Sequence, residues 1–274
     1  MKKRIKLFPH LILLPYLAVI LYPLLFVLNS SFKDNTQIVT HPWSLPESFS
    51  LENYTKAFTS AHIGKFFFNS LYISTTATTA SILLALGIAY AVTRMKFPTL
   101  SKMTYGLLLL SLLISPVSLL IPLYIMIKNL GLYNTPFALI VPYTAFGIPL
   151  SVFVIAAFLK SIPKELEEAG IMDGLSVFGL LGRIVLPLTM PTLVTVFIIN
   201  FISHWNEYIL ASLLLSGESL RTLPVAVVAF MDKFNFNYGA MSAAVMISCV
   251  PVIIVYAVLQ KKIIEGVAAG SVKG

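Results

Sequence analysis

Charged residues are scarce in this sequence of 274 residues. Asp, Glu, Lys and Arg make up 11% of the chain, whereas soluble globular domains carry about 25%. Hydrophobic residues reach 58%, and the mean hydropathy is +0.89. These values exclude an ordinary soluble domain, so we expect the length to be divided into several bilayer crossings of roughly 20 residues each.

Cysteine is almost absent, because Cys249 is the only one in the chain. A single thiol excludes an intrachain disulfide and a metal site built from several cysteines. Cys249 lies in an apolar run, where we expect it to pack as a small buried hydrophobe.

Motifs for nucleotide hydrolysis and for common hydrolytic chemistry are also missing. The sequence contains no G-x-x-x-x-G-K-[ST] loop for cradling phosphates, no HExxH metal pair and no GxSxG nucleophile turn. If the chain supports uphill transport, the energy must therefore enter through another polypeptide.

Long apolar stretches, in contrast, are abundant. In lipid the backbone must satisfy its own hydrogen bonds, so apolar stretches of this length form helices. The sequence predicts an all-α integral membrane protein, a single transmembrane domain over residues 1–274, with six helices at about 11–28, 66–93, 103–127, 137–159, 188–207 and 240–260.

The first stretch follows a basic start and could be read as a secretory signal. No small-x-small cleavage site follows it, because the chain continues Asn29-Ser30-Ser31-Phe32-Lys33. We expect an uncleaved anchor helix.

Basic residues are distributed unevenly between the two sides of these predicted helices. With the N-terminus inside, the inner segments are 1–10, 94–102, 160–187 and 261–274, and they hold 13 of the 19 Lys and Arg residues. The entire excess of +8 lies on this side, as the positive-inside rule expects. Both termini and the 160–187 loop are therefore predicted to be cytoplasmic, and no nucleic-acid partner is needed to explain the basic charge.

Small and hydroxylated residues fill the run Ser74 to Ser81 in the second span. They predict either close helix packing or a polar path. Prolines inside several spans predict kinks, and Gly147 beside Pro149 predicts a break in the fourth span.

Ionisable groups are nearly absent from the spans, and the nearest are His204 and Glu207 at the outer end of the fifth. One interpretation is anchoring at the membrane interface by Trp205 and Tyr208, with the charges snorkelling outward. The other is the polar rim of a substrate path. An intramembrane enzyme using His204 and Glu207 and a secondary carrier working alone are competing hypotheses, although a carrier generally needs buried carboxylates or matching broken helices.

The 160–187 loop has the pattern of two short helices. Pro163 suits a first helical turn, Glu165, Glu167 and Glu168 favour the positive end of the helix dipole, and Gly174 suits its end. A second short helix is predicted at 176–185. Small residues would keep one side of this pair thin, so that another protein could approach closely.

The same loop resembles the signature loop of binding-protein-dependent ABC importer permeases. That pattern reads EAA, three residues, G, nine residues, I-x-L-P, and here it is Glu168-Ala169-Gly170, Gly174 and Ile184-Val185-Leu186-Pro187. Gly170 replaces the second alanine, a change between small residues that we expect to leave close packing intact. Further strings resemble carbohydrate-uptake permeases, in particular the maltose-type second permease: residues 94–98, 205–208, 221–225 and 266–274.

The resemblance implies a type I ABC importer-like permease in the bacterial cytoplasmic membrane, moving a sugar or oligosaccharide. It also implies a second, non-identical permease subunit, two cytoplasmic ABC ATPases that bind the ATP and magnesium, an extracytoplasmic solute-binding protein, and no cofactor in this chain. A permease for a non-sugar solute is the alternative. The residues implied to contact the ATPase or anchor the loop are Glu168, Ala169, Gly170, Asp173, Gly174, Ile184, Leu186 and Pro187.

Polar residues in or beside the spans are candidates for the substrate path. We expect the path to be lined by Asn69, Asn200, Asn206 and Glu207.

Overall fold

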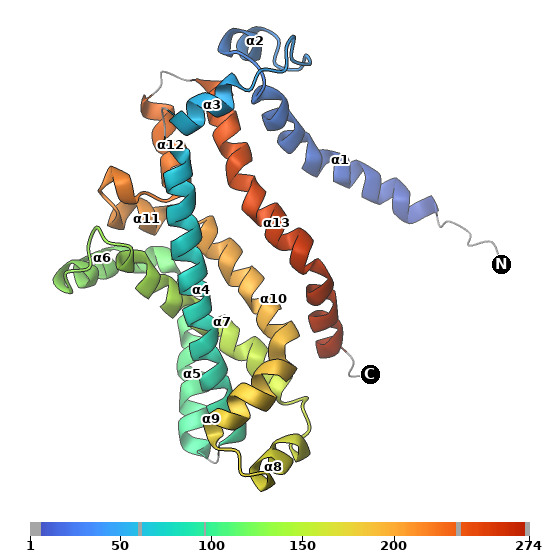
Figure 1. Cartoon of the computed structure of the whole chain (residues 1–274), viewed down its shortest axis with the longest axis vertical. Helices are drawn as coiled ribbons and strands as arrows, with labels where there is room; N and C mark the ends of the chain where they lie inside the picture. The colour runs from blue at the N-terminus through green and yellow to red at the C-terminus, as the bar shows by residue number, and fades with distance from the viewer. Residues whose placement is uncertain (1–6, 60–61, 96, 234–236, 272–274) are drawn as a thin grey trace. The chain divides into compact units, whose positions relative to one another are not determined.

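The computed structural model describes residues 7–59, 62–95, 97–233 and 237–271, and all regular structure in these ranges is helical (Figure 1). It divides into two compact units: unit 1 is Met1–Phe67 with Val225–Val250, and unit 2 is Phe68–Pro224 with Pro251–Gly274. Several basic residues used to predict the orientation lie outside the described residues: Lys2, Lys3, Arg4, Lys6, Lys96 and Lys273.

Five helical stretches in the described ranges are long and apolar enough to cross a membrane, or six if one bent pair counts as a span. The helices concerned overlap the predicted spans, and α13 continues past the predicted end at 260 to Ser271. They are α1 (Leu7–Ser30), α4 (Ile63–Arg94), α7 (Phe137–Leu159), α10 (Leu186–Trp205) and α13 (Tyr238–Ser271).

The third predicted span, 103–127, is the bent pair, and it is divided at a proline, as the prolines inside the spans predicted. The chain forms α5 (Pro98–Leu113), one 3-10 turn, η1 (Pro116–Leu119), and α6 (Leu120–Asn129), with a bend of 92°. Pro116 explains the position of the break. A proline disfavours the helical conformation of the residue before it, and Ser115 is extended at φ −66° and ψ 131°.

In unit 1, Asn53 of α3 (Glu52–Thr59) lies between the segment that follows α1 and the start of α13. Its Nδ2 donates to the carbonyls of Ser31 and Lys33, at 3.0 and 2.8 Å. A Cβ at Gly239 would stand 2.7 Å from the Lys33 carbonyl, so only glycine fits there without a backbone shift.

Lys33 itself is buried beside the short helix α2 (Asn35–Thr40). Its ammonium donates to the carbonyls of His41 and Pro42, both at 3.1 Å. Burial lowers the pKa of this ammonium group, because the charged form loses its hydration. The two hydrogen bonds fix the segment that follows α1.

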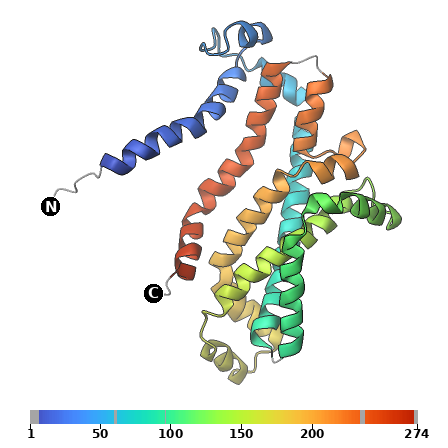
Figure 2. The same ribbon diagram turned by 180° about the vertical axis from the view of Figure 1, so that it is seen from behind.

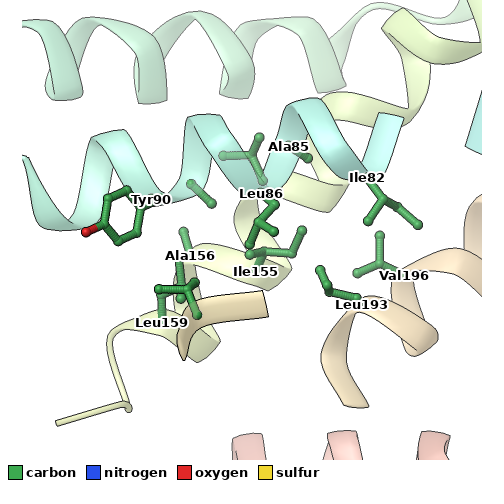
Figure 3. Packing of buried hydrophobic residues seen from close by; sticks show 12 residues of the cluster. Ile82, Ala85, Leu86, Tyr90, Ile155, Ala156, Leu159, Leu193 and Val196 are labelled. Atoms are coloured by element: carbon green, nitrogen blue, oxygen red, sulfur yellow. The ribbon is translucent and has the colours of Figure 1, made fainter. Parts of the chain in front are cut away.

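The core of unit 2 lies between α4, α7 and α10. Figure 3 shows Leu86 of α4, Ile155 of α7 and Leu193 of α10 pointing toward one another. The burial of such apolar side chains, together with their close packing, holds the three helices together.

Close helix packing also explains Gly147. A Cβ at Gly147 would lie 2.6 Å from Oγ of Ser81 on α4, so the small residues let α4 and α7 touch, as one interpretation of the 74–81 run predicted. The break expected at Gly147 and Pro149 is wrong, because α7 is continuous through Pro142 and Pro149. Here glycine permits close approach instead of a break.

Shorter helices complete the chain. The 160–187 loop contains α8 (Glu165–Met172), α9 (Val177–Leu180) and the π-helical turn η2 (Leu181–Val185), and α9 and η2 run directly into α10. In both views α8 and α9 lie at one end of unit 2, beside the start of α5 (Figures 1 and 2). After α10 come α11 (Ile209–Leu214), η3 (Glu218–Leu220) and α12 (Leu223–Lys233).

Candidate functional site

The 160–187 loop forms the predicted pair of short helices. Gly174 has a φ of +80°, the left-handed conformation that favours glycine at a helix end. The amide of Leu175 then donates to the carbonyl of Gly170 at 3.0 Å, which closes the turn. Ser176 caps α9, because its Oγ accepts from the amide of Gly179 at 3.3 Å. Both turns are thus defined by hydrogen bonds.

The eight predicted loop residues divide between the surface and the joint of the two helices. Gly170 is buried, and Ile184 and Leu186 are half-buried. The exposed ones are Glu168, Ala169, Asp173, Gly174 and Pro187.

Gly170 lies within this joint. A Cβ there would stand 2.6 Å from Cδ1 of Ile184 and 2.8 Å from Cδ2 of Leu180. Glycine and alanine are therefore not interchangeable in this packing unless the ends of those side chains shift.

Two large apolar side chains on α8 and α9 are exposed. Met172 is 87% exposed and Phe178 is 85% exposed. Exposed apolar side chains that gather on one surface, rimmed by polar residues, mark a protein contact. The exposed part of the loop thus combines large apolar side chains with the charged side chains of Glu168 and Asp173, and we take it as a candidate docking surface.

An ion pair that the sequence analysis missed fixes α8 to the end of α4. Nε of Arg94 lies 2.8 Å from Oε1 of Glu167, and their side chains are only 7% and 10% exposed. Nη2 of Arg94 also donates to the carbonyls of Leu159 and Ile162, at 2.7 and 2.8 Å. One guanidinium thus holds three segments of the loop region together.

A cavity of about 130 Å³ lies within unit 2. It is bounded by the 116–120 turn, α7, the end of α10 and the start of α11. Its lining includes Pro116, Val117, Leu120, Tyr143, Phe146, Gly147, Asn200, Ser203, His204, Glu207, Ile209 and Leu210.

Glu207 is fully engaged at the end of this cavity. Its Oε2 accepts from the Tyr143 hydroxyl at 2.6 Å. The amides of Leu210 and Ala211, at the start of α11, donate to its two oxygens at 2.7 and 3.0 Å. A carboxylate with three donors is well stabilised at a helix start.

His204 also lines the cavity, and it connects α10 to α4. Its ring stacks on Tyr143, with centroids 5.0 Å apart, and its Nδ1 lies 3.0 Å from Oγ1 of Thr78. Trp205 is only 1% exposed and stacks on Phe201. Anchoring of Trp205 at the membrane interface is therefore wrong, and this tryptophan belongs to the interior of unit 2.

Of the four predicted path residues, the structure brings two to the cavity. Asn200 lines it and donates to Oγ of Ser151 at 2.8 Å, and Glu207 lines it as described above. Asn69 instead donates to the carbonyls of Ser219 and Arg221, both at 3.0 Å. Asn206 is exposed and bonds within its own helix end, to the carbonyl of Ile202.

Tyr143, Thr78, Arg94 and Glu167 were not among the predicted site residues. Tyr143 and Thr78 lie in ordinary span positions of the sequence, so nothing local marks them. Arg94 and Glu167 carried a weak signal as charges beside span ends. Among the residues that the structure describes, no group of three or more His, Cys, Asp or Glu could hold a metal ion.

Comparison with known proteins identifies the family. Residues 77–266 match the model of the "Binding-protein-dependent transport system inner membrane component". The chain is 39% identical over 260 residues to the "Probable ABC transporter permease protein YurM" of Bacillus subtilis, covering 94% of this chain and 86% of that protein. It is 33% identical over 264 residues to the diacetylchitobiose uptake system permease protein NgcG of Streptomyces coelicolor, covering 96% and 87%.

A solved structure shares the fold. A bacterial ABC transporter involved in the import of the acidic polysaccharide alginate contains a chain that aligns with a TM-score of 0.80 and 22% identity, covering 93% of this chain and 95% of that one. The loop pattern, the apolar helices and the family match agree. The chain belongs to the family of inner membrane components of binding-protein-dependent transport systems, and it is a multi-pass permease of the bacterial cytoplasmic membrane.

Proposed function

We propose that this chain imports a sugar or oligosaccharide as one of two non-identical permease subunits. Two cytoplasmic ATPases would bind ATP and magnesium, and an extracytoplasmic binding protein would deliver the solute. The similarity to a diacetylchitobiose permease over almost the whole chain supports the sugar class. The chain itself contains no phosphate-cradling loop, which supports a separate ATPase.

The pair of helices α8 and α9 is the observation that carries this proposal. It exposes Glu168, Ala169 and Gly174 as well as the side chains of Met172 and Phe178. Gly170 allows α8 to pack closely against Leu180 and Ile184, and the Arg94–Glu167 ion pair attaches α8 to the end of α4. A rigid surface with a polar rim and apolar side chains suits a cleft on the ATPase. We infer that this surface is the coupling site and is cytoplasmic.

The cavity supports a substrate path in a closed conformation. Ligand pockets typically enclose about 300–1,000 Å³, and this cavity measures only about 130 Å³. To bind an oligosaccharide, the cavity must therefore become larger. Either α7 and α10 move apart, or the second permease contributes part of the lining of a larger cavity. The Asn200 amide can bond sugar hydroxyls, and the rings of Tyr143 and His204 can pack against sugar C–H faces. Asn69 and Asn206 would join the path only in another conformation.

Purification of the tagged chain in a gentle detergent tests the assembly. We expect a second permease and a P-loop ATPase to be recovered with it and identified by mass. Recovery of this chain alone, under conditions that keep a known importer intact, would contradict the proposal.

Reconstitution in liposomes tests the energy source. Uptake should require ATP and the binding protein, and it should be independent of ion gradients. Uptake driven by an ion gradient with this chain alone would instead support a secondary carrier.

A further inference from the structure

Arg94 is the last residue of α4, and its contacts reach two other segments. The ion pair leads to Glu167 on α8, and the two hydrogen bonds lead to Leu159 and Ile162, at and just after the end of α7. The start of the loop and the end of α4 are thus connected by one ion pair and two hydrogen bonds.

The chemistry of the pair suits a rigid connection. A guanidinium offers several donors in a planar fork. Here Nη2 bonds two carbonyls, and Nε meets the Glu167 carboxylate as a contact of opposite charges, without an aligned hydrogen bond. The buried position also reduces screening by salt. By contrast, Glu52 and Lys56 of α3 form an ion pair whose side chains are 68% and 48% exposed, and exposed pairs of this kind contribute little.

Two consecutive glutamates of α8 differ in their exposure. Glu168 is exposed on the docking surface, whereas Glu167 is buried against Arg94. We propose that Arg94 and Glu167 are positioning residues that make α8 and the end of α4 move as one body. The inference rests on the proposed function, because it takes α8 as the element on which the ATPase acts.

The test uses the assembled transporter with ATPase bound. Cys249 is replaced by alanine, and nitroxide labels are placed at Glu165→Cys on α8 and Leu83→Cys on α4, both exposed positions outside the proposed docking residues. The distance distribution between the labels is measured with and without ATP and magnesium. In the otherwise unmodified complex, we expect one narrow distribution that ATP does not change. In Glu167→Gln, ATP should shift or broaden it beyond the original width.

A second variant covers the case in which Glu167→Gln leaves a buried charge and fails to fold. Arg94→Met with Glu167→Leu removes both charges together, a replacement that buried pairs often tolerate, and ATP should shift or broaden its distribution as well. Glu52→Gln, which breaks the exposed pair, is the matched control and should behave like the unmodified complex.

The outcomes separate two failures. A distance that changes with ATP in the unmodified complex, or remains fixed in the variants, overturns this inference alone. An unmodified chain that retains no ATPase overturns the proposed function, and the inference with it.

Discussion

Two glycines of the 160–187 loop have different structural roles. Gly170 lies in a joint where a methyl group would require the ends of the Ile184 and Leu180 side chains to shift, whereas Gly174 adopts a left-handed backbone and faces open space. A side chain at Gly174 would therefore meet no atom of this chain, and its effect should be felt by whatever docks there.

Gly174→Trp should abolish ATP-driven uptake while the membrane fold remains intact, because the indole would occupy the docking surface. The measurement is uptake and ATPase recovery in parallel. Gly174→Asn is the matched control, since asparagine tolerates the left-handed conformation, and it should retain most activity. Normal uptake by the tryptophan variant would count against the docking assignment.

Glu207→Leu should lower the thermal stability of the purified chain. It would leave the amides of Leu210 and Ala211 and the Tyr143 hydroxyl without their acceptor, at about 1–3 kcal/mol for each buried unsatisfied group. Thermal unfolding in detergent measures this. Asn206→Leu is the control, because the exposed Asn206 bonds only its own helix. Equal stability of the two variants would contradict a structural role for Glu207.

At the scale of helices, the sequence predicted most of the fold from apolar length alone. The predicted 137–159 span coincides with α7, and Gly174 ends the α8 turn as expected. Kinks were predicted at the prolines inside the spans, but not that the helix would break at Pro116 and continue through Pro142 and Pro149, because the three look alike in sequence. Whether a proline breaks a helix depends on the neighbouring contacts. Pairs such as Arg94 with Glu167 and Tyr143 with Glu207 could not be predicted, since they form only after distant segments meet.

Gly147→Ala should destabilise the contact of α4 with α7, because the new Cβ would lie 2.6 Å from Oγ of Ser81. Overpacking of this kind costs about 1–3 kcal/mol, measurable as a lower unfolding temperature. Gly87→Ala, also in a span helix, meets no atom within 4 Å and should stabilise α4 by up to about 1 kcal/mol. An unfolding temperature of Gly147→Ala that is unchanged, or raised as in Gly87→Ala, would contradict the close-approach explanation.

At the scale of the whole molecule, the charge distribution predicts the orientation. In a Cys249→Ala background, a cysteine at Leu45 should react with a membrane-impermeant maleimide in intact cells, and one at Lys164 only after lysis. Both positions are exposed on the described surface. The reverse pattern would contradict the positive-inside assignment and place α8 and α9 on the wrong side for an ATPase.

The break between α5 and α6 has a consequence for how the protein is made. The 16 residues of α5 rise about 24 Å at 1.5 Å per residue, which is short of a hydrocarbon core of about 30 Å. By hydropathy alone, however, residues 103–127 are one uninterrupted span. We expect the insertion machinery to release this stretch into lipid as a single straight segment, and the bend to arise afterwards, when the completed neighbours fold against it.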